Sequence, residues 1–116
     1  MMEIENLDNY TLVTLHGVLD DEMKSDFDEQ LHPLIEVRGA RLVIDLSHCQ
    51  RITSAGIALL VTLIARANMK GGRVVFANPA PFVMTVFEMA KLDRYFEICD
   101  TTSEAISVIT TPPPTE

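Results

Sequence analysis

Residues 41–70 read RLVIDLSHCQRITSAGIALLVTLIARANMK and change character twice along their length. The segment 41–46 is almost continuously apolar, as expected of a strand that is covered on both faces of a sheet. The polar segment 47–53 is expected to form a loop. From residue 54 to residue 70 apolar side chains recur at helical spacing, which predicts a long helix that ends at the glycine pair 71–72. A buried strand, a loop and a helix in this order are typical of an α/β fold.

The residues before this stretch predict two strands and one amphipathic helix. Segments 2–6 and 11–16 are expected to be strands joined by a hairpin, and the second alternates apolar and polar residues. Residues 17–21 are expected to form a turn, in which Asp20 or Asp21 caps the helix that follows. That helix has one apolar stripe, formed by Met23, Phe27, Leu31, Leu34 and Ile35.

The residues after the central stretch predict two more strands and two more helices. Segment 73–77 is a second buried strand, and the prolines in 78–81 place the start of a helix just beyond it. A short strand is expected at 95–99. Residues 101–104 have the pattern of a capping box and open the last helix. The expected element order is therefore β-β-α-β-α-β-α-β-α, with a mostly parallel central β-sheet and about four helices.

The length of the chain, 116 residues, is that of one domain. One domain is therefore expected over residues 1–111. The proline-rich residues 112–116 cannot continue a helix and are expected to form a disordered tail.

Composition and charge narrow the class of function. The hydrophobic fraction is 47% and the charged fraction is 22%, ordinary values for a globular protein. The formal net charge of -8 argues against binding to nucleic acid or to an anionic membrane, and it fits a basic or neutral protein partner. No apolar run reaches the roughly 18 residues of a membrane span, and the N-terminal residues lack the pattern of a secretion signal. These features predict a cytoplasmic protein that does not insert into a membrane.

Side chains that could carry catalysis or bind a metal are sparse. The sequence has no glycine-rich phosphate loop, no Cys-x-x-Cys pair and no His-Glu-x-x-His motif. The histidines are not spaced as metal ligands, and His48 and Cys49 would point in opposite directions on an extended segment. Cys49 and Cys99 are expected to be reduced thiols. The carboxylates of Asp20 and Asp21 fit a solvated helix cap better than an acid/base pair. No metal and no cofactor are therefore expected.

Two hydroxyl side chains, Thr53 and Ser54, stand where the long helix is predicted to begin. A hydroxyl at this point can cap the free backbone N–H groups of the first turn. A phosphate on the same hydroxyl would lie beside those N–H groups and the positive end of the helix dipole. It would add a charge of about -1.5 to -2 at pH 7. From the local residues alone, a simple cap and a phosphorylation switch both stay open.

The long helix has two different sides. Its core-facing stripe consists of Ile57, Leu60, Val61 and Ile64. Its opposite side carries Ala55, Ala58, Leu59, Thr62 and Arg66. A face of small residues with one leucine, next to Ser54, suits a docking surface whose affinity a phosphate could cancel. A single exposed leucine is also ordinary in a globular protein, so this interpretation stays open as well.

Six short motifs follow one another in a fixed order over almost the whole chain. They are GVLD at 17–20, LVIDLS at 42–47, ITSAGI at 52–57, GGRV at 71–74, NPAP at 78–81 and LDRYF at 92–96. In this order they resemble the STAS domain, and specifically the stand-alone anti-sigma factor antagonists. The element order predicted above is similar to the fold of that family.

The resemblance implies a phosphorylation switch centred on Ser54. In proteins of this kind the signature is Asp-Ser-Ser-Gly or a close variant, and a partner kinase phosphorylates its first serine. Aligned on Gly56, that serine is Ser54 here. The kinase is also the anti-sigma factor, so the unphosphorylated antagonist binds it and frees the sigma factor. The phosphorylated form is released, and a serine phosphatase resets it. The domain would be a substrate and a ligand, and not a catalyst.

The resemblance also implies a partner-binding surface around Ser54. Asp20 would lie beside the site, and the helix would contribute Ala55, Gly56 and Leu59. Thr53 stands where the family often has aspartate. It counts among the partner-binding residues, it is expected to be a helix cap, and it offers a second hydroxyl that could be phosphorylated.

Two other functions remain as alternatives. A STAS protein can be a structural or regulatory subunit, for example of a phospholipid-transport complex or a stressosome-like scaffold, and its serine then need not be modified. A nucleotide-binding enzyme on a doubly wound fold would need a glycine-rich phosphate loop, which this sequence lacks. The predicted function is therefore that of an anti-sigma factor antagonist.

Overall fold

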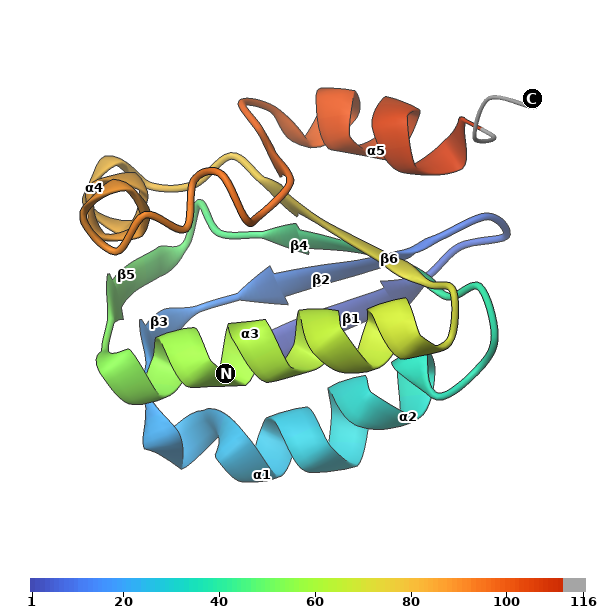
Figure 1. Ribbon diagram of the computed structural model, residues 1–116, viewed down its shortest axis with the longest axis horizontal. Coiled ribbons are helices and arrows are strands. Elements are labelled where there is room, and N and C mark those ends of the chain that lie inside the picture. The colour runs from blue at the N-terminus through green and yellow to red at the C-terminus, as the bar shows by residue number, and fades with distance from the viewer. Residues whose placement is uncertain (112–116) are drawn as a thin grey trace.

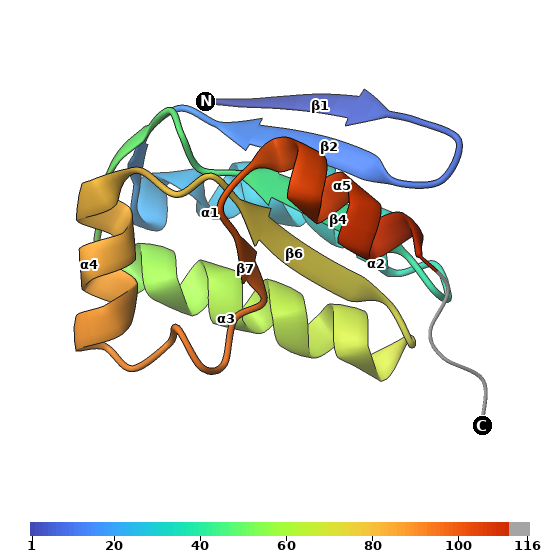
Figure 2. The same ribbon diagram turned by 90° about the horizontal axis from the view of Figure 1, so that it is seen from above.

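The computed structural model describes residues 1–111, so the tail predicted at 112–116 lies outside the described residues. The described chain forms three layers, a central sheet with helices on both of its faces (Figures 1 and 2). α3 (Ser54–Met69) and a helical arm over residues 21–35 cover one face. α5 (Thr102–Thr110) covers the other face. This arrangement confirms the predicted α/β class.

Five strands form the central sheet in the order β1-β2-β4-β6-β7. They are β1 (Met2–Asn6), β2 (Thr11–Leu15), β4 (Arg41–Asp45), β6 (Arg73–Ala77) and β7 (Ile98–Cys99). β1 is antiparallel to β2, and the other neighbouring pairs are parallel, as predicted. β7 is shorter than predicted because the N–H groups of Tyr95 and Phe96 both donate to the carbonyl of Leu92 and close a turn. Phe96 then packs in the core against Phe76 and Phe87.

The two central strands, β4 and β6, are buried on both faces, as their apolar composition predicted. Successive side chains of a strand point to opposite faces, so each strand serves two cores. The larger core, between the sheet and α3 with the helical arm, contains Leu42, Ile44, Val74 and Phe76. The smaller core, under α5, contains Val43, Val75, Ala77, Ala105 and Ile109.

The helical arm is continuous but has three kinds of turn. Its parts are η1 (Asp21–Met23, a 3-10 helix), α1 (Lys24–Asp26), η2 (Phe27–Leu31, a π-helix) and α2 (His32–Ile35). Pro33 has no backbone N–H, and in a regular α-helix its ring would clash with a carbonyl of the preceding turn. The wide π-turn relieves this clash, and in it the N–H of His32 donates to the carbonyl of Phe27. The predicted stripe faces the core: Met23, Phe27, Leu31 and Ile35 are buried, and Leu34 is half-buried.

The last two helices begin as predicted. α4 (Pro81–Met89) has its proline at the first position and lies at one end of the sheet (Figure 2). Thr101 caps α5, because its Oγ1 accepts a hydrogen bond from the N–H of Glu104 at 3.1 Å. The carboxylate of Glu104 accepts one from the N–H of Asp100 at 3.2 Å, one residue before the cap, so the reciprocal bond of the predicted capping box is shifted by one residue.

Two segments that were predicted to be irregular are strands. Within the turn predicted at 17–21 lies β3 (Gly17–Leu19), and within the loop predicted at 47–53 lies β5 (Cys49–Ile52). The two pair with each other in parallel and form a separate small sheet. The prediction was wrong because neither segment has the alternation of apolar and polar residues that is typical of a half-buried strand. Each becomes a strand only through its pairing with a distant segment.

Candidate functional site

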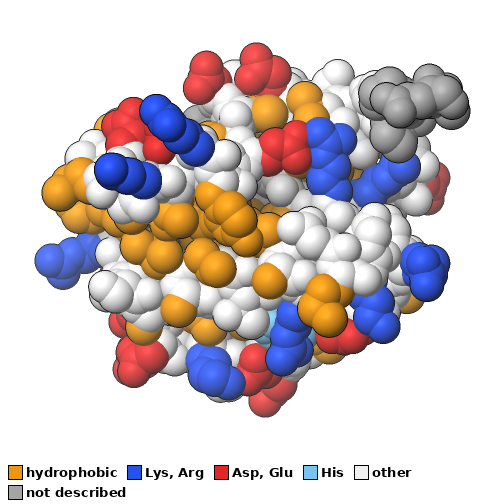
Figure 3. All heavy atoms as spheres, viewed as in Figure 1, with side chains coloured by type: hydrophobic (Ala, Val, Ile, Leu, Met, Phe, Trp, Pro, Cys, Tyr) orange, Lys and Arg blue, Asp and Glu red, His pale blue; other side chains and the backbone are white. Residues whose placement is uncertain are grey.

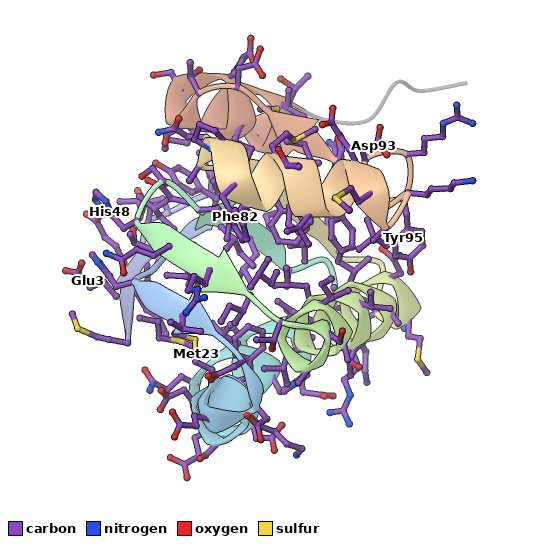
Figure 4. The ribbon with its side chains drawn as sticks, turned by 90° about the vertical axis from the view of Figure 1, so that its left-hand side faces the viewer. Glu3, Met23, His48, Phe82, Asp93 and Tyr95 are labelled. Carbon is purple, nitrogen blue, oxygen red and sulfur yellow. The ribbon has the colours of Figure 1, made fainter. Side chains whose placement is uncertain are left out.

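β3 and β5 end together at one edge of the molecule, and a helix begins after each of them (Figures 1 and 4). Leu19 is paired with Ile52, so Asp20 and Thr53 follow at the same level. The backbone N–H of Thr53 donates to the carbonyl oxygen of Leu19 at 3.1 Å. This pairing brings together the residues that the sequence places in two separate motifs.

Asp20 and Thr53 are both helix caps, as predicted. The carboxylate of Asp20 accepts a hydrogen bond from the N–H of Glu22 at 3.1 Å. Oγ1 of Thr53 accepts one from the N–H of Gly56 at 3.2 Å, and it donates to the carbonyl of Leu19 at 3.4 Å. The hydroxyl of Thr53 therefore ties the first turn of α3 to the end of β3.

Ser54 is the first residue of α3, and it is exposed. No residue from 1 to 111 makes a hydrogen bond to its hydroxyl in the structure, because Thr53 supplies the cap. Of the two neighbouring hydroxyls, that of Thr53 is held in two hydrogen bonds, and that of Ser54 is available for modification. A phosphate on it would lie at the N-terminus of a helix of 16 residues, where free N–H groups and the helix dipole favour an anion.

Gly56 is buried where α3 passes over β3. A Cβ on this residue would lie 2.1 Å from the carbonyl oxygen of Leu19, which is far inside van der Waals contact. Only glycine therefore lets the helix approach the strand this closely. Gly56 was predicted to belong to the partner-binding surface, and the structure gives it the task of setting the position of Ser54.

The outer side of α3 agrees with the prediction at all but one residue. The exposed residues are Ala55, Ala58, Thr62 and Arg66. Leu59 is half-buried and packs against the larger core, so the expectation of an exposed leucine is wrong. The helix turns Leu59 toward the core because that residue lies near the edge of the buried stripe of Leu60 and Leu63.

The exposed apolar side chains next to the site come from other elements. Phe82, the second residue of α4, is 55% exposed, and Val18 on β3 is 39% exposed. α4 packs beside β5, and Figure 4 shows Phe82 at the end of α4 that borders this strand. Hydrophobic side chains also gather on the surface between α4 and α3 (Figure 3). Phe82 was not predicted as a surface residue, although its position outside the buried pair Val83 and Phe87 was a readable signal.

Negative charge predominates on the other side of Ser54. Asp21 and Glu22 are exposed at the start of the helical arm, and Asp20 is half-buried beside them. None of the three forms an ion pair with another described residue. A hollow of about 450 Å³ beside β3 is lined in part by Val18, Asp20, Glu22 and Met23. Arg51 on β5 is exposed between this acidic border and α4.

Other candidate chemistry is absent from the described part of the chain. Within residues 1–111 no group of three His, Cys, Asp or Glu side chains could hold a metal ion, and no helix is long and apolar enough to cross a membrane. Cys49 and Cys99 are free, and burial raises the pKa of the Cys49 thiol. His48 is exposed and stacks on His16 with 5.0 Å between ring centroids. His48 and the buried Cys49 therefore point in opposite directions, as predicted.

Comparison with known sequences places the chain in a family. The family model described as Mlab, STAS domain, matches residues 2–100. BtrV of Bordetella bronchiseptica, a protein provisionally named an anti-sigma factor antagonist, is 21% identical over 110 residues, which are 95% of each chain.

Solved structures share the fold over nearly the full length. An anti-sigma factor antagonist from Mycobacterium paratuberculosis has a TM-score of 0.83 and 19% identity, covering 96% of this chain and 94% of its own. A provisionally named antagonist from Thermotoga maritima has a TM-score of 0.80 and 23% identity, covering 95% of both chains. The anti-sigma factor antagonist SpoIIAA in its unphosphorylated form has a TM-score of 0.76 and 19% identity, covering 94% of this chain and 96% of its own. These structures show the common fold, and the family model covers most of the sequence. The chain therefore belongs to the STAS domain family.

Proposed function

We propose that this protein is an anti-sigma factor antagonist that works as a phosphorylation-controlled partner switch. In the unphosphorylated state it binds an anti-sigma factor that is also an ATP-binding serine kinase, and the sigma factor is set free. Phosphorylation of Ser54 abolishes this binding, and a serine phosphatase restores it. The observation that carries the proposal is the exposed hydroxyl of Ser54 at the first position of α3, with no hydrogen-bond partner among residues 1–111.

The relatives support this choice within the STAS family. BtrV and the Mycobacterium paratuberculosis protein are both named for antagonism of anti-sigma factors. SpoIIAA has been solved in an unphosphorylated and in a phosphorylated form, with TM-scores to this chain of 0.76 and 0.70. A phosphate on this fold is therefore compatible with a folded domain.

The start of α3 is suited to reversible phosphorylation. Ser54 can accept the group without breaking a hydrogen bond, since the cap of the helix is held by Thr53. The positive end of the helix dipole stabilises a nearby anion by about 0.3–1 kcal/mol at an exposed site. The phosphorylated protein should therefore remain folded in the same conformation.

Release of the partner follows from charge and size. The protein has a formal net charge of -8, and the carboxylates of Asp21 and Glu22 near Ser54 form no ion pair with any other residue from 1 to 111. A phosphate adds about -1.5 to -2 at pH 7 in the middle of the contact. Repulsion and steric overlap then both oppose rebinding. The chain acts as substrate and ligand in this cycle, uses no cofactor of its own, and works in the cytoplasm, where ATP and the transcription machinery are found.

Affinity capture from a lysate of the source organism tests the proposal. The baits are the wild-type protein, Ser54→Ala and Ser54→Asp, each shown to be folded by its thermal unfolding curve. We expect an ATP-binding kinase on the wild-type and Ser54→Ala baits and its loss from Ser54→Asp. Equal recovery of the kinase on all three baits would show that charge at Ser54 does not control release.

The same experiment separates the alternative function. A structural or regulatory subunit of a phospholipid-transport complex or a stressosome-like scaffold would use the site as a permanent contact. Recovery of a transporter or a scaffold protein on both the wild-type and Ser54→Asp baits would favour that function over the switch.

A further inference from the structure

The small β3–β5 sheet has one face that is open to solvent. Leu19, Cys49 and Ile52 are buried on its inner side. Its outer side carries Val18 and Arg51, which are paired in register and both exposed. Among the described elements, α4 borders this face on one side and the start of the helical arm on the other (Figure 4). The strands of the open face lead directly to Asp20 and to Thr53.

Phe82 is exposed at the border of this face although the fold does not require it there. Its neighbours Val83 and Phe87 fill the core from the same helix and are fully buried. Phe82 is 55% exposed, so more than half of this large apolar side chain faces solvent. A large aromatic side chain in such a place is typical of the anchor residues of protein interfaces.

We infer that the open β3–β5 face, with Phe82 as its apolar anchor, forms the second half of the surface that docks the kinase. The inference rests on the proposed function, and it adds a contact that does not involve the phosphorylated residue. Val18 and Phe82 provide the apolar centre of this docking face. Asp21 and Glu22 form its acidic border.

The area around Ser54 is too small to hold a partner by itself. Specific interfaces bury about 800 Å² on each partner. The exposed helix residues next to Ser54, Ala55 and Ala58, have methyl side chains. A burial of that size must therefore extend beyond α3, and the neighbouring exposed apolar side chains are those of Val18 and Phe82.

The charge of the docking face defines the chemistry of its partner. Asp21 and Glu22 have no ion-pair partner among residues 1–111. The lining of the hollow beside β3 includes three acidic residues, Asp20, Glu22 and Asp26, together with Met1 and His16. The complementary surface of the kinase presents an apolar pocket for Phe82 with lysine or arginine side chains at its edge. The face also carries Arg51, but the formal net charge of -8 on each molecule opposes pairing with a second copy of this chain and favours a basic partner.

The test measures dissociation constants by titration calorimetry with the purified kinase that the wild-type bait recovers. Phe82→Ala should weaken binding about 10- to 100-fold, as expected for an aromatic anchor. Alanine favours a helix and Phe82 is more than half exposed, so this variant should remain folded, which its thermal unfolding curve checks. Met89→Ala is the matched control, because Met89 lies on the same helix and is 80% exposed. It should change binding by less than about twofold.

The variants Ser54→Asp and Phe82→Ala report on different proposals. If Ser54→Asp loses the kinase and Phe82→Ala binds like the wild type, the switch stands and the docking face is wrong. If Phe82→Ala loses it and Ser54→Asp does not, the docking face stands and the release mechanism is wrong. Sedimentation of the wild-type protein as a dimer that Phe82→Ala dissolves, with kinase binding unchanged, would assign the face to a second copy and overturn the inference. A wild-type bait that recovers no kinase would overturn both proposals.

Discussion

Two adjacent hydroxyls at the start of α3 have separate tasks. The hydroxyl of Thr53 donates a hydrogen bond to the carbonyl of Leu19 and accepts one from the N–H of Gly56. Ser54, one residue later, is exposed and makes no such bond within residues 1–111. A kinase that used Thr53 would have to break the cap first. Ser54 is therefore the hydroxyl that we assign to phosphorylation, and Thr53 is the residue that holds it in place.

Thr53→Val should destabilise the protein by about 1 kcal/mol, because valine keeps the shape of the side chain but cannot cap the helix. Urea unfolding followed by circular dichroism measures this change. Ser54→Ala is the control, and it should stay within about 0.5 kcal/mol of the wild type. If both variants lost the same stability, the division of tasks between the two hydroxyls would be wrong.

Gly56→Ala should destabilise the protein by about 2 kcal/mol or more, although alanine is the better helix former. The added methyl group would meet the backbone of Leu19, which cannot rotate away as a side chain could. Ala58→Gly, a change between the same two residue types on the exposed side of α3, is the matched control and should cost about 1 kcal/mol. Thermal unfolding of both variants checks the comparison, and a Gly56→Ala protein as stable as the wild type would contradict it.

Among the elements, those with a strong local pattern were predictable from sequence and those held by distant pairing were not. The continuous apolar runs of β4 and β6 and the helical spacing of α3 are properties of each segment alone, so their types were correct. β3 and β5 owe their structure to each other across the chain, so no local pattern indicated them.

The same division applies to the candidate site. The caps at Asp20 and Thr53 follow from residue types that prefer helix starts, and both were predicted. The burial of Gly56 depends on how closely α3 approaches β3, and no local pattern in the sequence indicates this. The exposure of Phe82 was readable from its position outside the pair Val83 and Phe87, but the packing of α4 beside β5 was not.

The helical arm contains a group that should make stability depend on pH. His32 is buried against α3, and within residues 1–111 its Nδ1 has no hydrogen-bond partner. Burial, helped by the guanidinium of Arg66, lowers the pKa of His32 below its ordinary value of 6.5, against the opposing effects of Asp28 and Glu36. The folded protein therefore keeps this imidazole neutral at a pH where the unfolded chain already binds a proton.

The free energy of unfolding should consequently fall as the pH drops below 6.5, the ordinary pKa of histidine, and level off below the folded pKa of His32. Urea unfolding at a series of pH values between neutrality and pH 5 measures this slope. His32→Leu should remove most of it, whereas His48→Gln, a change at an exposed histidine, should keep it. An unchanged slope in His32→Leu would assign the pH dependence to other groups.

At the scale of the whole molecule, the close packing of α3 on β3 indicates that the proposed switch acts locally. Thr53, Gly56 and Leu19 hold the site rigidly, and Ser54 lies outside these contacts. A charge at Ser54 should therefore alter the surface without moving the layers behind it.

Amide NMR spectra of the wild type and Ser54→Asp test this locality. Chemical shifts should change at residues 17–23 and 50–60 and stay constant in α5 on the far side of the sheet. Arg66→Gln, at the other end of the exposed side of α3, is the control for the effect of altering one charge. Changes in α5 specific to Ser54→Asp would show that phosphorylation acts through a rearrangement of the domain.

The parallel pairing of β3 with β5 also governs when the switch comes into being during synthesis. Residues 17–19 leave the ribosome well before residues 49–52. The carbonyl of Leu19 cannot accept its hydrogen bond from the N–H of Thr53 until the later segment has emerged. The helical arm and the hairpin of β1 and β2 can form early. The backbone arrangement that positions Ser54 forms only when β5 pairs with β3. A nascent chain therefore contains Ser54 before it contains the folded site, so the proposed kinase can recognise the domain only after residues 49–52 have left the ribosome.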